Sequence, residues 1–184
     1  MSHLDRPAVK RVRDALIAAG LEDTVVALAD TARTAEDAAS AVGCDLGAIV
    51  KSLCFSVGNR FVMALIAGDH MCKEDTLPTA LKIRGTVRRP QASEVKGITG
   101  FTIGGVAPVG LLHPLPIVID VSLKRFDTVY AAAGHPHCIF AISPSDLGRI
   151  TEGVISHTVA EPFEGVAPYI PPIRRSKTFS QTAD

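Results

Sequence analysis

Two neighbouring strands joined by a tight turn constrain the fold of this chain more than any other feature. Residues 51–57 and 60–67 are both rich in apolar side chains, and Gly58-Asn59 between them is a two-residue hairpin signal. Side chains alternate between the two faces of a strand, so Lys51 shares a face with an apolar row while Ser52 points the other way. A lysine in that row either extends outward from the sheet edge or reaches into a cleft to meet an anion or a carbonyl.

Capping and turn signals divide the rest of the chain into short helices and strands. Thr34 precedes a capping-box pattern, and Gly43 stands where that helix is expected to stop. The expected helices are 7–19, 35–42, 73–82, 91–96 and 144–150, and the further strands are 24–29, 86–89, 115–121, 129–133, 137–142 and 154–159. A chain of 184 residues that is 47% hydrophobic can bury one substantial core. We therefore expect one domain over residues 1–160.

The segment from Gly100 to Gly110 is unusually rich in glycine. Adjacent Gly104 and Gly105 leave the backbone without Cβ cover, so a ligand can approach their N–H groups, and Pro108 stiffens the return. The segment predicts either a fixed pocket wall built from backbone amides or a surface connection without a ligand.

Charge and composition narrow the classes of partner. Lys+Arg and Asp+Glu are both 19, so the net charge is zero, which argues against a protein that grips long duplex nucleic acid by its phosphates. The net charge does not exclude a protein that contacts only the end of a nucleic acid. No apolar run reaches membrane-span length and no signal peptide is evident, so we expect a cytoplasmic protein. Residues 161–184 are expected to form a proline-rich, basic tail.

Several common catalytic sites are absent from the sequence. The glycine segment lacks the endings of a P-loop and of a dinucleotide site, and no G-x-S-x-G elbow is present. His135 and His137 share a strand face, but no third ligand stands at a familiar spacing, so we expect neither metal nor cofactor. His135 lies in a Gly-His-Pro turn, where it is either a proton carrier at a cleft rim or an exposed turn residue. A cleft with donors but no protein nucleophile suits hydrolysis of a reactive acyl ester.

Three segments together resemble the YbaK/ProX/EbsC family, the free-standing relatives of the editing domain inserted in bacterial prolyl-tRNA synthetase. They are IVKSL (49–53), TGFTIGGVAPVG (99–110) and AGHP (133–136), in this order and at this spacing. The resemblance covers about residues 34–159. It implies a single α/β domain with a mixed, strongly curved, barrel-like sheet flanked by helices. It also implies hydrolysis of the ester between a wrong amino acid and the tRNA 3′ end, without metal or cofactor.

The resemblance also implies roles for individual positions. Lys51 matches the family's functional lysine and is expected to stabilise developing negative charge, and His135 is the second candidate catalytic residue. The expected substrate-binding residues are Ser52, Gly104, Gly105, Pro108, Gly110 and Gly134. Discrimination by pocket size is worth only about 1–3 kcal/mol per methylene.

Two departures from the family pattern argue against cysteine specificity. Ile139 stands roughly where the cysteinyl-specific branch has an acidic residue, and the tyrosine expected near residues 26–28 is absent. The leading hypothesis is therefore a trans-editing aminoacyl-tRNA deacylase for a mischarged small amino acid. Its partner is the aminoacyl-tRNA 3′ end, with prolyl-tRNA synthetase as a further partner, and the protein is either a monomer or a homodimer. The alternatives are a non-catalytic module that binds aminoacyl-tRNA, nucleotide or amino acid, and a protein that docks on a synthetase through its tail.

Overall fold

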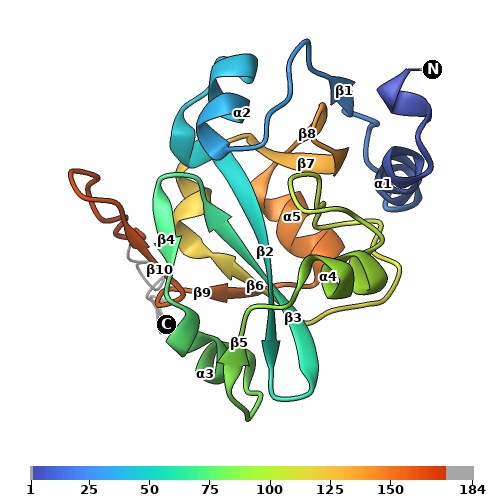
Figure 1. Cartoon of the computed structure of the whole chain (residues 1–184). Coiled ribbons are helices and arrows are strands. Elements are labelled where there is room, and N and C mark those ends of the chain that lie inside the picture. Colours follow the sequence, from blue (N-terminus) through green and yellow to red (C-terminus); the bar gives the residue numbers. More distant parts are fainter. Residues whose placement is uncertain (1, 173–184) are drawn as a thin grey trace, which may run out of the picture.

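The chain folds around one mixed β-sheet with helices packed on its faces (Figure 1). The computed structural model describes residues 2–172. Within them the main sheet has 8 strands in the order β1-β8-β7-β2-β3-β6-β9, with β5 paired to β2 beside this path. These strands are β1 (Val26–Ala27), β2 (Ile49–Val57), β3 (Arg60–Ala67), β5 (Val87–Arg88), β6 (Ile117–Asp120), β7 (Val129–His135), β8 (Cys138–Ile142) and β9 (Val154–Ser156). The pairs β2/β7, β3/β6 and β6/β9 are parallel and the others antiparallel, which confirms the predicted α/β domain with a mixed sheet.

The predicted hairpin forms the centre of this sheet. β2 and β3 pair in antiparallel register from Val50↔Ala67 to Val57↔Arg60, around the turn at Gly58-Asn59. β3 is covered on both faces, since residues 62–67 have 0% exposure. Continuous burial explains why β3 reads as an unbroken apolar run rather than as an alternating one.

Five α-helices and four 3-10 turns connect the strands in the described part of the chain. The α-helices are α1 (Pro7–Ala18), α2 (Ala35–Val42), α3 (Leu77–Leu81), α4 (Ala92–Thr99) and α5 (Pro144–Thr151), and the turns are η1 (His3–Asp5), η2 (Leu46–Ala48), η3 (Glu74–Thr76) and η4 (Val121–Arg125). Helix α2 shows the expected signals, because the Thr34 hydroxyl accepts the Asp37 N–H and Gly43 ends the helix at φ 77°. The expected helix 73–82 is shorter, since η3 precedes α3 and Lys82 closes it at φ 56°. No helix among residues 2–172 is long and apolar enough to cross a membrane.

Hydrophobic side chains gather in two main clusters. The larger cluster joins α1, α4 and α5 to the sheet through Val12, Val95 and Leu147. The other packs Leu77 of α3 against Phe55 of β2 and neighbouring strands. Alternate residues of β2 therefore face different clusters, as the alternation of its sequence predicts.

A second, two-stranded sheet extends the fold beyond residue 160. β10 (Ala160–Pro162) pairs antiparallel with β4 (His70–Cys72), at the left of Figure 1. The tail was expected to begin at residue 161, but residues 161 and 162 belong to β10, because they pair with β4. Its basic cluster, Arg174, Arg175 and Lys177, lies outside the described residues.

Candidate functional site

A cleft of about 450 Å³ opens beside the middle of β2, on the side of this strand that faces away from β3. β7 pairs only with Ile49 and Val50 at one end of β2, and β5 pairs only with Ser56 and Val57 at the other. Between these ends, residues 51–55 pair with β3 alone, and they all line the cleft. The cleft therefore occupies an interruption in the sheet.

Backbone groups of β2 face this interruption. Met63 donates its N–H to Pro116 O at 2.9 Å, away from β2, so its partner Cys54 also turns its N–H and C=O away from β3. Alternation gives Ser52 the same orientation. The Ser52 Oγ is buried and has no hydrogen-bond partner in the described part of the chain. The cleft wall thus offers hydrogen-bonding groups that the fold itself does not use.

The side chains around the cleft are mostly apolar, and those that carry charge are basic. The apolar lining includes Ala38, Ile49, Val50, Leu53, Phe55, Val95, Ile103, Val106, Tyr130 and Ile139. The charged lining residues are Arg33, Lys51 and Arg89, and no Asp or Glu belongs to the lining among residues 2–172. Arg89 Nε donates to Glu74 at 2.8 Å, and the Arg89 guanidinium lies 5.8 Å from the Phe55 ring centre. This lining favours a ligand with an apolar part and an anionic part.

Lys51 turns inward rather than out to solvent. Its Nζ donates to the carbonyl of His70 and lies 5.0 Å from the centre of the Phe163 ring. Burial lowers the pKa of Lys51 below its ordinary value, against the opposing charges of Glu36, Asp120 and Asp69. An ammonium has three N–H donors, so the bond to His70 leaves others for a ligand in the cleft.

The glycine segment divides between the cleft and the core. Gly104 lines the cleft at φ 98°. Gly105 packs against the main chain of the Gly-His-Pro turn, since a Cβ placed on it would lie 2.8 Å from the Cα and N of His135. Pro108 is buried, and Gly110 lies against α1, where Arg11 donates to its carbonyl at 3.2 Å. The second half of the segment therefore fixes the loop to the domain.

The Gly-His-Pro turn also lies beside the cleft lining rather than in it. Gly134, at φ 90°, packs on α1, where an added Cβ would lie 2.8 Å from Ala8 O. The His135 ring stacks on those of His3 and His137, with centres 4.5 Å and 5.5 Å away. Burial, with the positive charge of Arg6, lowers the pKa of His135.

The three stacked rings do not form a metal site. Among residues 2–172, no group of three or more His, Cys, Asp or Glu is arranged to hold a metal ion.

The structure brings together three of the sequence-predicted residues, Lys51, Ser52 and Gly104, and adds others that the sequence did not single out. Arg33, beside the Thr34 cap, and Tyr130 of β7 line the cleft, and Phe163 covers Lys51. Lys82, Arg84 and Arg88 closely precede Arg89 in the sequence, and this basic run is a local signal for a contact with an anion. Phe163, in contrast, reaches Lys51 only through the pairing of β10 with β4.

The mixed α/β fold thus has a cleft that combines a half-buried lysine, a glycine wall and the free main-chain edge of a strand. The model of the aminoacyl-tRNA editing domain family matches residues 29–150, and this chain belongs to that family. It is 33% identical to the uncharacterised protein YwhH of Bacillus subtilis (strain 168) over 145 residues, which cover 78% of this chain and 91% of that protein.

Two further proteins are similar to this chain. Proline–tRNA ligase of Bacillus licheniformis is 31% identical over 101 residues, which span 55% of this chain but only 18% of the ligase. The solved structure of a candidate trans-editing enzyme for prolyl-tRNA synthetase superposes with a TM-score of 0.74 at 35% identity, covering 82% of this chain and 96% of that one.

Proposed function

We propose that this protein is a trans-acting aminoacyl-tRNA deacylase that hydrolyses the ester of a mischarged small amino acid. The observation that carries the proposal is the interruption in the sheet. It joins a half-buried lysine, unpaired strand-edge amides and an apolar pocket within a domain of the editing family.

The reaction requires only groups that the cleft and the substrate provide. Water attacks the acyl carbon, the bond from that carbon to the ribose oxygen breaks, and the ribose oxygen leaves with a proton. The vicinal ribose hydroxyl assists the attacking water. Lys51 binds the terminal phosphate or the acyl carbonyl and stabilises the developing oxyanion, together with the N–H groups of Ser52 and Cys54.

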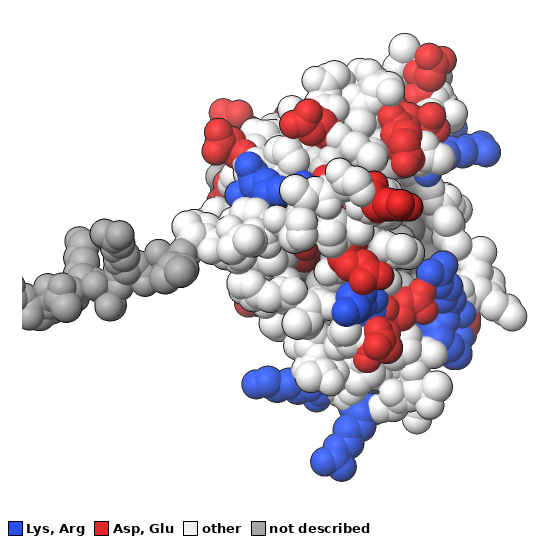
Figure 2. Space-filling view, turned by 90° about the vertical axis from the view of Figure 1, so that its left-hand side faces the viewer, with Lys and Arg blue, Asp and Glu red and all other residues white. Residues whose placement is uncertain are grey.

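The dimensions and charge of the protein fit contact with an RNA end. A cleft of about 450 Å³ lies in the range of small-ligand pockets, so it holds a terminal aminoacyl-nucleotide rather than a duplex. On the face shown in Figure 2, acidic and basic side chains are interspersed without a continuous basic surface, as the net charge of zero suggests. We infer that the tRNA 3′ end is bound end-on.

A deacylation panel tests the proposal. Wild type, Lys51→Ala and Lys51→Met are incubated with tRNAs charged with alanine, serine, threonine, cysteine and proline, with and without EDTA. We expect hydrolysis of one or two species, at least about a hundredfold slower in both variants and indifferent to EDTA. Met keeps the length of the lysine stem and so separates loss of charge from loss of packing.

The same panel separates the remaining possibilities. No turnover of any species, combined with saturable binding, would replace the proposal by the binding module. His135→Asn tests the second candidate residue. Full activity of this variant would mean that His135 acts only in the structure of the turn, and a strong loss of activity would mean that it takes part in proton transfer.

A further inference from the structure

Lys51 is held by a segment that lies beyond the family match, which ends at residue 150. β10 pairs with β4 through Glu161↔Met71 and Pro162↔His70, and the Phe163 N–H donates to Asp69 O at 3.0 Å. These bonds fix the main chain of Phe163 next to the β3–β4 turn, and its ring covers the Lys51 ammonium at 5.0 Å. Such contacts of a cation with an aromatic face favour one position of the charge.

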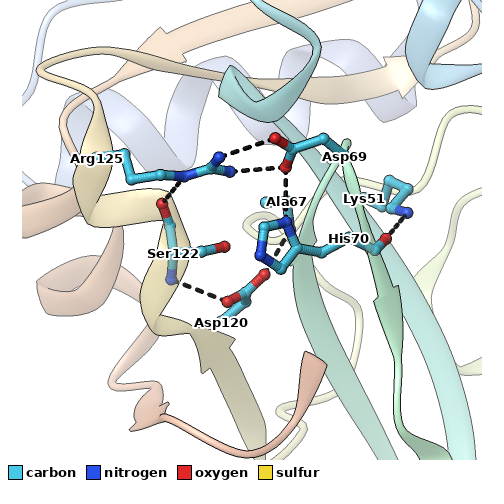
Figure 3. A network of polar contacts seen from close by, with 7 residues as sticks. All are labelled: Lys51, Ala67, Asp69, His70, Asp120, Ser122 and Arg125. Carbon is cyan, nitrogen blue, oxygen red and sulfur yellow. Dashed lines mark hydrogen bonds and ion pairs between the residues drawn. The ribbon is translucent and has the colours of Figure 1, made fainter. Parts of the chain in front are cut away.

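The carbonyl that receives Lys51 is itself anchored by a buried polar network (Figure 3). The His70 ring Nδ1 meets Asp69 Oδ1 at 2.7 Å, and Arg125 donates to both oxygens of Asp69, at 2.8 and 2.6 Å. Arg125 Nε also donates to Ser122 O at 2.7 Å. The bidentate pair with Asp69 thus joins the β3–β4 turn to η4 and fixes the direction of the His70 main chain.

Neighbouring contacts leave this network little freedom. Asp120 accepts the Ala67 N–H at 3.1 Å and the Ser122 N–H at 2.9 Å, so η4 is tied to the end of β3 as well. A Cβ on Gly47 would lie 2.6 Å from the Arg125 guanidinium, so η2 closes the network on its remaining side. Asp69 and His70 have exposures of 9% and 3%.

We propose that Asp69, Arg125 and Phe163 are positioning residues that form a two-sided seat for Lys51. The Asp69–Arg125 pair sets the His70 carbonyl on one side of the ammonium, and the C-terminal segment supplies the Phe163 ring on the other. A free lysine side chain loses rotamer freedom when it binds a substrate. In this seat the Lys51 side chain is already ordered before the substrate binds, so the ammonium lies beside the cleft when the ester arrives. This role rests on the proposed deacylase function.

Competitive acetylation tests the seat without relying on catalysis. The full chain is treated with trace acetic anhydride at a series of pH values, and the rate at each lysine is measured by mass spectrometry. The titration gives the pKa of the Lys51 amine and its limiting reactivity separately. In Phe163→Ala and Arg125→Gln we expect a higher limiting reactivity and a pKa nearer the ordinary value, because solvent reaches the amine, with Lys10 on α1 unchanged.

Deacylation kinetics of the same variants test the role in catalysis. We expect kcat/KM to fall about tenfold or more in Phe163→Ala and Arg125→Gln and to be largely retained in Phe163→Tyr. Arg125→Lys keeps the charge but loses the bidentate pair with Asp69, so its kcat/KM should lie between those of wild type and Arg125→Gln. Arg13→Gln breaks the ion pair of Arg13 with Asp23 (2.6 Å) on another part of the surface and should match wild type in both measurements. Circular dichroism and a urea midpoint establish folding, and Phe163→Ala carries the test if Arg125→Gln does not fold.

The outcomes separate the seat from the proposed function. Unchanged Lys51 acetylation in both variants would overturn the seat, whatever their activity. Increased acetylation with undiminished deacylation would also overturn it, because the position of Lys51 would not matter for the reaction. Increased acetylation together with a wild type that deacylates no tRNA would support the seat as structure and refute the deacylase.

Discussion

The contact of the glycine segment with the Gly-His-Pro turn can be tested by adding a single methyl group. In Gly105→Ala the new Cβ would lie 2.8 Å from the His135 Cα and N and 3.0 Å from the Gly134 carbonyl carbon. All these atoms are backbone, so none can swing aside as a flexible side chain would. The turn cannot retreat either, because Gly134 already packs on α1.

The expected cost follows from this crowding. Forcing an extra methyl into a closely packed site typically costs about 1–3 kcal/mol. We expect a loss of about 2 kcal/mol in the free energy of unfolding, which for a domain of this size lowers Tm by about 4–8 °C. Deacylation should fall as well, since a displaced loop moves Gly104, which lines the cleft.

Gly97→Ala is the matched control. Gly97 is exposed in α4, and a Cβ on it would meet nothing within 4 Å. Alanine is the better helix former, so this variant should gain up to about 1 kcal/mol. Urea unfolding at pH 7, followed by circular dichroism, measures both variants. Equal stability of Gly105→Ala and Gly97→Ala would refute the docking of the loop against the turn.

Three further outcomes are expected. Burial alone would raise the pKa of Asp69, but hydrogen bonds from Arg125 and His70 lower it from 3.8 to about 2. The stabilisation from the Asp69 carboxylate is therefore full above about pH 5 and is lost as the pH falls towards 2. Asp69→Asn should remove about 2 kcal/mol of the fall in the free energy of unfolding between these pH values, as measured by acid titration. Thr34→Ala removes the cap of α2 and should cost about 1 kcal/mol in the same urea assay, and no loss would contradict the cap. Burial raises the pKa of Cys54 from 9.0 to about 11, so native protein at pH 8 should be alkylated by iodoacetamide about a hundredfold more slowly at this thiol than urea-unfolded protein; equal rates would contradict its burial.

The elements predicted from the sequence are those with local causes. Gly58-Asn59 and Thr34 act within a few residues of themselves, and the structure has the hairpin and the helix that they predict. The expected strand 24–29 is reduced to β1, Val26–Ala27, because it pairs with β8 at only two positions. Strand β4 was missed, since it has three residues and depends on β10 for its partner.

The site could be predicted only in part, for a related reason. Lys51, Ser52 and Gly104 stand in recognisable segments and line the cleft. The cleft itself exists because β7 and β5 leave the middle of β2 uncovered, and no pattern within β2 encodes where its neighbours stop. Ile139 lines the cleft, whereas the equally apolar Met63 and Leu65 of β3 are buried in the core.

The interrupted edge of β2 also has a consequence for how such a domain changes over time. Donors that belong to the main chain survive every substitution except proline, because each residue carries the same amide. Side chains such as Ile103 and Ile139 can therefore be exchanged, and the shape of the cleft altered, while the hydrogen-bonding wall persists. Under the proposed function, the capacity to hold an ester and the choice of which ester to hold would thus be inherited separately.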